Sequence, residues 1–161
     1  MGDFIFTLQY KPSDYILLKE NNLATLDMNK WEKEKKEIEG LIQLNLKIES
    51  KDSNKEMLQI GATSVQEYTE RIQYFSYDAQ KDIFLIDGKD TLPCILYHFE
   101  RSYNLAPYSN LVLGFKSSKK FGEDQQDKII SFDDQALRQG KINFIIKATN
   151  LKNIPSLKLN S

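Results

Sequence analysis

The sequence predicts a mainly β fold with short helices (α+β), in which an antiparallel sheet of about eight strands forms a sandwich or a barrel. Several segments alternate apolar and polar residues with a period of two, the pattern of a strand with one buried face. Clusters of Asp, Gly and Lys separate these segments in the manner of hairpin turns. The 161 residues suit one globular domain, 1–161.

The first half of the chain predicts two strands and several short helices. Residues 4–10 and 41–49 alternate in character and are expected to be strands. Ser13 or Asp14 can cap a helix through Glu20. Further helices are expected where two residues have the spacing of a capping box, at Asn29 and Glu32, Ser53 and Glu56, and Ser64 and Glu67. The last of these helices should bury Val65, Tyr68 and Ile72 on one face.

The second half predicts consecutive strands joined by acidic turns. Aromatic and β-branched residues fill the segments on either side of the turns DAQK and DGKD. Residues 119–128 are polar and charged, which predicts a mobile loop. Strands are expected at 72–77, 82–86, 94–101, 111–115, 128–132 and 141–148.

Composition and charge argue against several classes of partner. The net charge is −1 and there are few arginines, so the chain has neither the field nor the side chains that gather phosphates, and no nucleic-acid partner is predicted. No apolar run approaches the ~20 residues that span a bilayer. The motifs of nucleotide-binding loops, zinc proteases and serine hydrolases are missing from the sequence. No cofactor is predicted.

The only cysteine and the only histidine, Cys94 and His98, invite a thiol–imidazole dyad. On a strand, residues four apart share a face but lie ~13 Å apart, beyond the reach of a general base. Pro93 and the alternating Ile95, Tyr97 and Phe99 favour a strand, so no catalytic residue is predicted.

The same segment supplies too few ligands for zinc. His98 and Glu100 should share one strand face, but a structural zinc site needs four ligands and the chain has no second histidine or cysteine. Carboxylates in the turns are explained by turn chemistry and do not match a calcium loop. No metal is therefore predicted.

The aromatic residues between Leu92 and Phe115 allow two interpretations. Rings near a strand end often complete a core, whereas exposed tyrosine supplies contact area for a protein or sugar partner. Pro107 forces the segment NLAPY to turn. The candidate binding residues in this segment are Tyr97, His98, Phe99, Glu100, Arg101, Tyr103 and Tyr108.

Two stretches, DTLPCILYHFERSYNLAPYSNLVLGF and FTLQYKPSDYILLKE, resemble uncharacterised exported bacterial proteins that are often lipoprotein-like. The resemblance covers about a third of the chain and carries no activity. It implies an extracytoplasmic protein of the cell envelope, lipid-anchored through an upstream cysteine in the full-length protein, because Cys94 lies within a predicted strand. A strand that follows Met1 and Gly2 directly also agrees with a removed leader.

These observations lead to three functional hypotheses. The first is a non-enzymatic β-rich interaction domain that holds a protein partner in a bacterial envelope-associated or surface assembly. The second is a barrel or sandwich that encloses a small apolar or sugar ligand, with His98 and Glu100 as its polar groups. The third is an enzyme that uses His98 and Glu100, although neither a nucleophile nor an oxyanion donor is identifiable.

Overall fold

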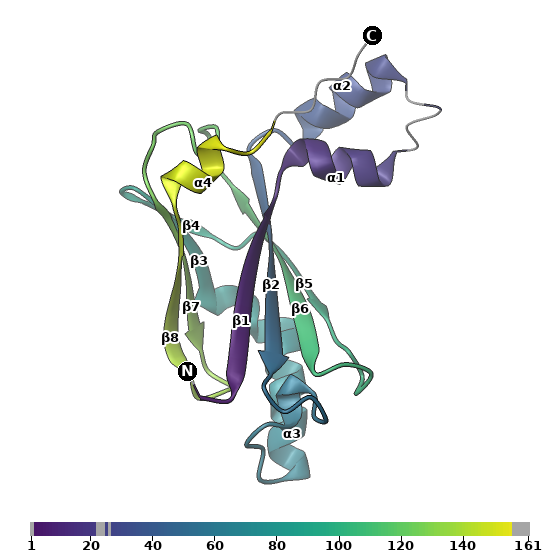
Figure 1. Ribbon diagram of the computed structural model, residues 1–161, viewed down its shortest axis with the longest axis vertical. Helices are drawn as coiled ribbons and strands as arrows, with labels where there is room; N and C mark the ends of the chain where they lie inside the picture. The colour runs from purple at the N-terminus through teal and green to yellow at the C-terminus, as the bar shows by residue number, and fades with distance from the viewer. Residues whose placement is uncertain (1, 22–24, 26, 156–161) are drawn as a thin grey trace.

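The computed structural model describes residues 2–21, 25 and 27–155 and shows two four-stranded antiparallel sheets that enclose one core (Figure 1). Sheet A has the order β1 (Phe4–Lys11), β2 (Leu41–Ser50), β6 (Tyr108–Lys116) and β5 (Leu96–Glu100). Sheet B has the order β4 (Asp90–Pro93), β3 (Ile83–Asp87), β7 (Lys128–Asp134) and β8 (Gly140–Ile146). The sheets are not closed into a barrel, so the predicted mainly β fold is confirmed in its sandwich form.

The core lies between the inner faces of the two sheets. On β2 every second residue is buried, as the alternation predicted, with Leu44 and Leu46 fully removed from solvent. Inward-facing residues of β6, β3 and β7 complete the layer. Each buried Leu, Ile or Phe contributes ~1.5–3 kcal/mol, so the register of these strands is fixed by which face carries the apolar set.

The segment 72–77 is a helix, and its prediction as a strand is wrong. Helix α3 (Val65–Gln73) continues into one turn of π-helix, Tyr74–Asp78, and a 3-10 turn, Ala79–Asp82. Arg71, Phe75 and Ala79 are buried at spacings of four, so the segment buries a helical stripe. The β-forming composition of 72–77 is overridden by this packing against the sandwich.

The chain changes sheets at Cys94 and Ile95. The predicted DGKD turn joins β3 to β4, with Gly88 at φ 63, but the short strand that follows it was not predicted. The Cys94 amide then donates to Ile83 of sheet B at 3.3 Å, and the Ile95 amide donates to Gly114 of sheet A at 2.8 Å. The predicted strand 94–101 therefore begins only at Leu96.

The helices lie at the two ends of the sandwich (Figure 1). Helices α1 (Ser13–Glu20) and α2 (Met28–Glu37) lie at one end, where Leu17 and Trp31 are buried, and α4 (Ala148–Lys152) follows β8. Helix α3 lies at the opposite end. No helix in the described part of the chain is both long and apolar enough to cross a membrane.

Three of the four predicted helix starts need correction. Helix α1 begins at Ser13, but its N-cap is Pro12 and no side chain caps it, so neither Ser13 nor Asp14 has the predicted capping role. Ser64 does cap α3, accepting a hydrogen bond from the Glu67 amide at 3.0 Å, although Val65 is exposed and not on the buried face. Helix α2 is capped by Asp27, not Asn29. No helix follows Ser53, where only a 3-10 turn, Met57–Gln59, is formed.

Candidate functional site

Strand β5 divides four of the predicted site residues between its two faces. Tyr97 and Phe99 point into the sandwich and pack against the core. The Tyr97 hydroxyl donates to the Phe75 carbonyl at 2.6 Å, and the Phe99 ring centre lies 5.6 Å from that of Phe75. Burial raises the pKa of Tyr97 well above its ordinary value. Both residues thus hold the π-helical turn against the sheet, and their side chains are partly buried.

His98 and Glu100 lie on the exposed outer face of sheet A, where the side-chain amide of Asn110 donates to the Glu100 carboxylate at 3.2 Å. Cys94 is buried in the core on the other side of the sheet. Its Sγ donates to the Leu96 carbonyl at 3.1 Å, and burial raises the pKa of the thiol to about 11. Cys94 and His98 are therefore on opposite faces, because the chain changes sheets between them, and not on one face as predicted.

The remaining predicted residues lie in and beside the loop 101–107, which joins β5 to β6. Tyr103 and Asn104 have φ values of 50 and 64, in the left-handed region that costs a non-glycine residue ~1–2 kcal/mol. Two consecutive residues keep this unfavourable conformation only where contacts with the surrounding structure hold them in it. The hydrogen bond from the Leu105 amide to the Ser102 carbonyl, at 3.0 Å, closes the turn.

A buried carboxylate holds the loop in this conformation. The Glu56 side chain is fully buried, and its Oε2 accepts the Asn104 amide at 3.1 Å. The Ser102 hydroxyl shares its hydrogen between the same oxygen, at 3.3 Å, and the Ala106 carbonyl, at 2.9 Å. Glu56 thereby fixes the backbone on both sides of Tyr103.

The charge of Glu56 is balanced by Arg101 and Tyr68. Arg101 Nη2 lies 3.5 Å from Glu56 Oε1 and donates to the Tyr68 hydroxyl at 2.6 Å, while that hydroxyl donates to Glu56. The guanidinium also lies over the rings of Tyr68 and Tyr103, at 5.6 and 4.8 Å from their centres. Burial, together with the bond to Glu56, raises the pKa of Tyr68, which therefore stays protonated as a donor.

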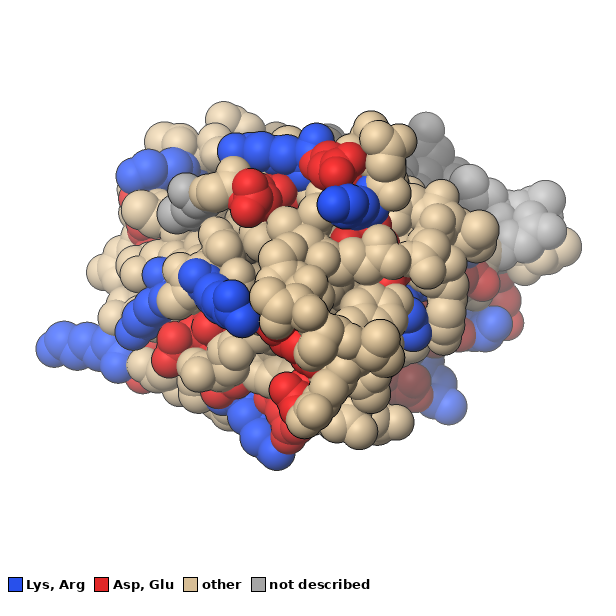
Figure 2. Space-filling view, turned by 90° about the horizontal axis from the view of Figure 1, so that it is seen from below, with Lys and Arg blue, Asp and Glu red and all other residues tan. Residues whose placement is uncertain are grey.

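The loop lies at the end of the sandwich where α3 lies (Figure 1). Tyr103 is 68% exposed and Leu105 is 90% exposed. Beside them is an open pocket of about 190 Å³ lined by Asn54, Lys55, Gln59 and the loop itself. Figure 2 views this end and shows acidic and basic side chains scattered around uncharged surface, with no region of one sign. Tyr108 lies next to the loop, with Lys47 Nζ 5.1 Å from its ring centre.

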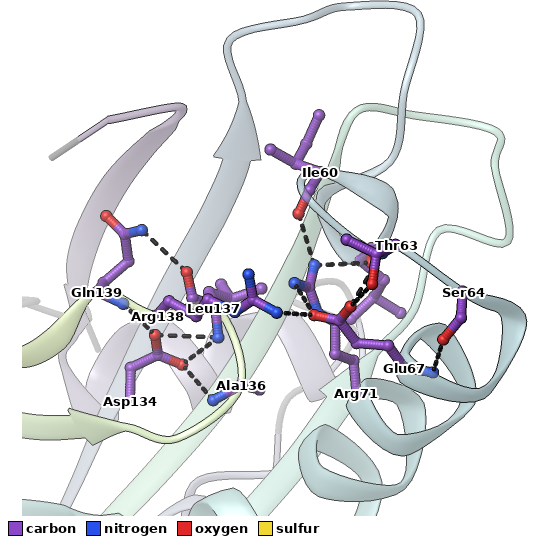
Figure 3. Close-up of polar contacts among 11 residues, drawn as sticks. Ile60, Thr63, Ser64, Glu67, Arg71, Asp134, Ala136, Leu137, Arg138 and Gln139 are labelled. Atoms are coloured by element: carbon purple, nitrogen blue, oxygen red, sulfur yellow. Dashed lines mark hydrogen bonds and ion pairs between the residues drawn. The ribbon is translucent and has the colours of Figure 1, made fainter.

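A second charged cluster at the same end centres on Arg71 and Glu67 (Figure 3). Buried Arg71 donates to the carbonyls of Leu58 and Ile60 at 3.1 and 2.6 Å and to Glu67 at 2.9 Å. Glu67 also accepts from Arg138 at 2.8 Å, and the Thr63 amide and hydroxyl lower its pKa to about 2. This cluster ties α3 to the neighbouring turns.

Glu56 was missed as a site residue by sequence reasoning. Its spacing from Ser53 indicated a helix cap, whereas its carboxylate binds groups 45 to 48 positions away in the chain. No local pattern marks such a contact. Among the described residues, no three or more His, Cys, Asp or Glu side chains are grouped so as to hold a metal ion.

Comparison of the chain with family models, with characterised proteins and with solved structures gives no match. The site is therefore interpreted from its own geometry.

Proposed function

We propose that the chain is a non-enzymatic interaction domain that contacts a protein partner through the loop 101–107. The observation that supports this most strongly is the left-handed pair Tyr103 and Asn104, held by the buried Glu56 carboxylate. The large side chains that this arrangement displays, Tyr103 and Leu105, lie in solvent and add nothing to the core. Strained backbone that is over-determined by its surroundings is typical of binding sites.

The physical advantage of such a loop is preorganisation. A partner that binds a mobile loop must order its backbone at ~1–2 kcal/mol per residue, whereas this loop is already ordered by its bonds to Glu56. Tyrosine contributes a large, stiff contact area, and an arginine stacked beneath it keeps the ring in place. The proposed contact surface includes Arg101 and Tyr103 from the residues that the sequence suggested and leaves out Tyr97 and Phe99, which pack against the core.

A ligand enclosed by the sandwich has less support. His98 and Glu100 point away from the interior, and the space beneath β5 is filled by Tyr97, Phe99 and Phe75. The pocket beside the loop is open and, at about 190 Å³, smaller than the ~300–1,000 Å³ of typical ligand sites. Membership of a bacterial envelope or surface assembly rests on the sequence resemblance alone and stays a prediction.

Site-specific photocrosslinking tests the loop as a protein contact. A photoreactive phenylalanine analogue would replace Tyr103 or Leu105 in the full chain, expressed in the organism that makes it. The matched control is the same analogue at Tyr15, a tyrosine that is 50% exposed on α1 at the far end of the sandwich. We expect one adduct common to positions 103 and 105 and missing at 15. An adduct formed equally at all three positions would contradict the proposal.

Once the crosslinked partner is purified, its affinity gives a second measurement. Tyr103→Ala should weaken binding about 30-fold, the effect of losing one aromatic hot spot. Tyr15→Ala should leave the affinity unchanged. Glu56→Ala should also weaken binding although Glu56 is buried, because the loop must then be ordered on binding. An affinity that is insensitive to Glu56→Ala would show that the held conformation is unimportant.

A further inference from the structure

The four edges of the two sheets differ in how well they are protected against pairing with another strand. Edge strand β4 has four residues and ends in Pro93, and β5 has five residues. Edge strand β8 carries Lys141 within it and Lys147 directly after it. Short length, proline and lysine are common devices that prevent edge pairing. Strand β1 is the longest of the four, with eight residues, Phe4–Lys11; its only lysine is its last residue, and Pro12 follows it.

The backbone of β1 has a free row of hydrogen-bonding groups. The Lys51 amide donates to the Asp3 carbonyl at 2.9 Å, so the odd-numbered residues of β1 direct their backbone groups to β2 in the alternating antiparallel pattern. The N–H and C=O groups of Phe4, Phe6, Leu8 and Tyr10 therefore point away from β2. None of these groups has a backbone or side-chain partner among the described residues.

The core-facing side chains along this edge are incompletely covered. Phe6, Leu8 and Tyr10 pack against the core but remain partly exposed, whereas the inward residues of the central strand β2 are buried. Across the flank of the sandwich the only aromatic neighbour of Phe6 on sheet B, among the residues described, is Phe144 of β8, with ring centres 6.1 Å apart. A further strand beside β1 would cover this row.

The sequence of β1 is complementary to itself. In an antiparallel pair of two β1 strands centred on Thr7, Phe4 faces Tyr10, Phe6 faces Leu8, and Asp3 faces Lys11 of the other copy. The even-numbered residues form the hydrogen-bonded pairs. The odd-numbered residues form the non-hydrogen-bonded pairs, whose side chains lie closest, so Asp3 and Lys11 meet twice by symmetry. Neither side chain has an ion-pair partner among the described residues.

We propose that β1 pairs with β1 of a second copy of this chain around a two-fold axis through Thr7, joining two sheets A into one continuous sheet. The other edges do not offer this match. In a self-pair of β8 centred on Phe144, Lys141 would face Lys147, which follows the strand, and the like charges would repel; β4 and β5 are short. The inference goes beyond the proposed function and is independent of the loop 101–107. The antiparallel arrangement places the two loops at opposite ends of the dimer.

Disulfide trapping tests the axis directly. At a non-hydrogen-bonded pair the Cα atoms are ~4.5 Å apart, which suits a disulfide. Thr7→Cys should therefore give a covalent dimer on a non-reducing gel after mild oxidation. Gln9→Cys is the matched control: it lies on the same exposed face, but two copies would be ~13 Å apart and should stay uncrosslinked. The native Cys94 is buried and common to both variants.

Charge exchange tests the register in solution by sedimentation equilibrium. Asp3→Lys and Lys11→Asp should each raise the dimer dissociation constant about tenfold, since two attractive pairs become repulsive. The double variant should recover the original value. Asp3 is exposed and Lys11 is partly exposed, and thermal melts identify any variant that fails to fold. A monomer at all concentrations up to ~0.5 mM, a dimer insensitive to both changes, or equal crosslinking of Gln9→Cys would overturn the proposal.

Discussion

The two charged clusters at the α3 end of the sandwich each bury a charged side chain, but these side chains hold different parts of the molecule. Glu56 and Arg71 are 2% and 3% exposed, and each is surrounded by hydrogen bonds. Arg71 binds groups within 13 positions of itself in the chain, so its cluster fastens α3 to adjacent turns (Figure 3). Glu56 binds a loop 45 to 48 positions away.

The Arg71 cluster therefore contributes mainly to stability, whereas the Glu56 cluster contributes mainly to the shape of the exposed surface. Every group around Arg71 serves the fold, and nothing large and apolar is displayed by its partners. The groups around Glu56 hold Tyr103 and Asn104 in costly conformations and leave Tyr103 and Leu105 exposed. A buried charge of the second kind is the better indication of a functional site.

The largest effect is expected from Arg71→Met. Its loss leaves Glu67 and the carbonyls of Leu58 and Ile60 without their buried donor, which should lower the free energy of unfolding by about 3–5 kcal/mol. Arg138→Met is the matched control, because Arg138 binds the same Glu67 oxygen from solvent and should cost about 1 kcal/mol or less. Urea unfolding measures both, and equal losses would contradict the distinction.

A smaller and more local effect is expected from Glu56→Ala. Removing the carboxylate eliminates its bonds to the Asn104 amide and Ser102 hydroxyl and takes away the ion-pair partner of Arg101, at a cost of about 2–3 kcal/mol. Hydrogen exchange at the Asn104 amide should become faster. Exchange of the β2 amides should still require global unfolding of the domain. Glu70→Ala, an exposed position on α3, serves as control. Unchanged exchange at Asn104 would exclude Glu56 as the group that holds the loop.

The left-handed backbone conformation of Asn104 can be tested by comparing two substitutions at this position. Asn104→Val should lower stability by about 1–2 kcal/mol, because a β-branched residue tolerates this conformation poorly. Asn104→Gly should stay within about 1 kcal/mol of the parent, since glycine adopts it without steric cost. Thermal unfolding of both variants gives the order, and a valine variant as stable as the glycine variant would show that the loop relaxes.

The smallest effect is a pH dependence in the Arg71 cluster. The bonds from Thr63 lower the pKa of Glu67 from its ordinary 4.5 to about 2 in the folded protein. A depressed carboxyl pKa stabilises the fold above pH 4.5, and the contribution is lost as the pH falls from 4.5 toward 2. The difference in Tm between the parent and Glu67→Gln should therefore be largest above pH 5 and shrink toward pH 2. A difference that is constant over this range would contradict the assignment.

The sequence predicted the fold correctly where a strand has one buried face and one solvent-exposed face. Strands β1 and β2 follow the alternation closely, because their polar positions face solvent. The segment 72–77 misled because its aromatic and β-branched residues suit a strand, while its burial at every fourth residue depends on packing that composition does not reveal.

The candidate site was predictable only in part. Alternation along β5 indicated that Tyr97 and Phe99 share a face, but not whether that face was core or contact surface, and the structure places it in the core. Arg101 and Tyr103 were identified as candidates from their type and position. Glu56 could not be, since a contact between segments almost fifty residues apart leaves no periodicity in either.

The sandwich has two flanks, one formed by the edge strands β4 and β5 and the other by β1 and β8. They differ because the chain connects the two sheets differently along each flank. The connections cross between the sheets after β2, β4 and β6, and the tightest crossing, Cys94 and Ile95, joins the flank formed by β4 and β5. On the other flank β1 and β8 meet through side chains alone, among them Phe6 and Phe144. Because side-chain packing alone joins β1 to β8 there, transient opening of the folded domain should begin along this flank and expose the aromatic rings to solvent first.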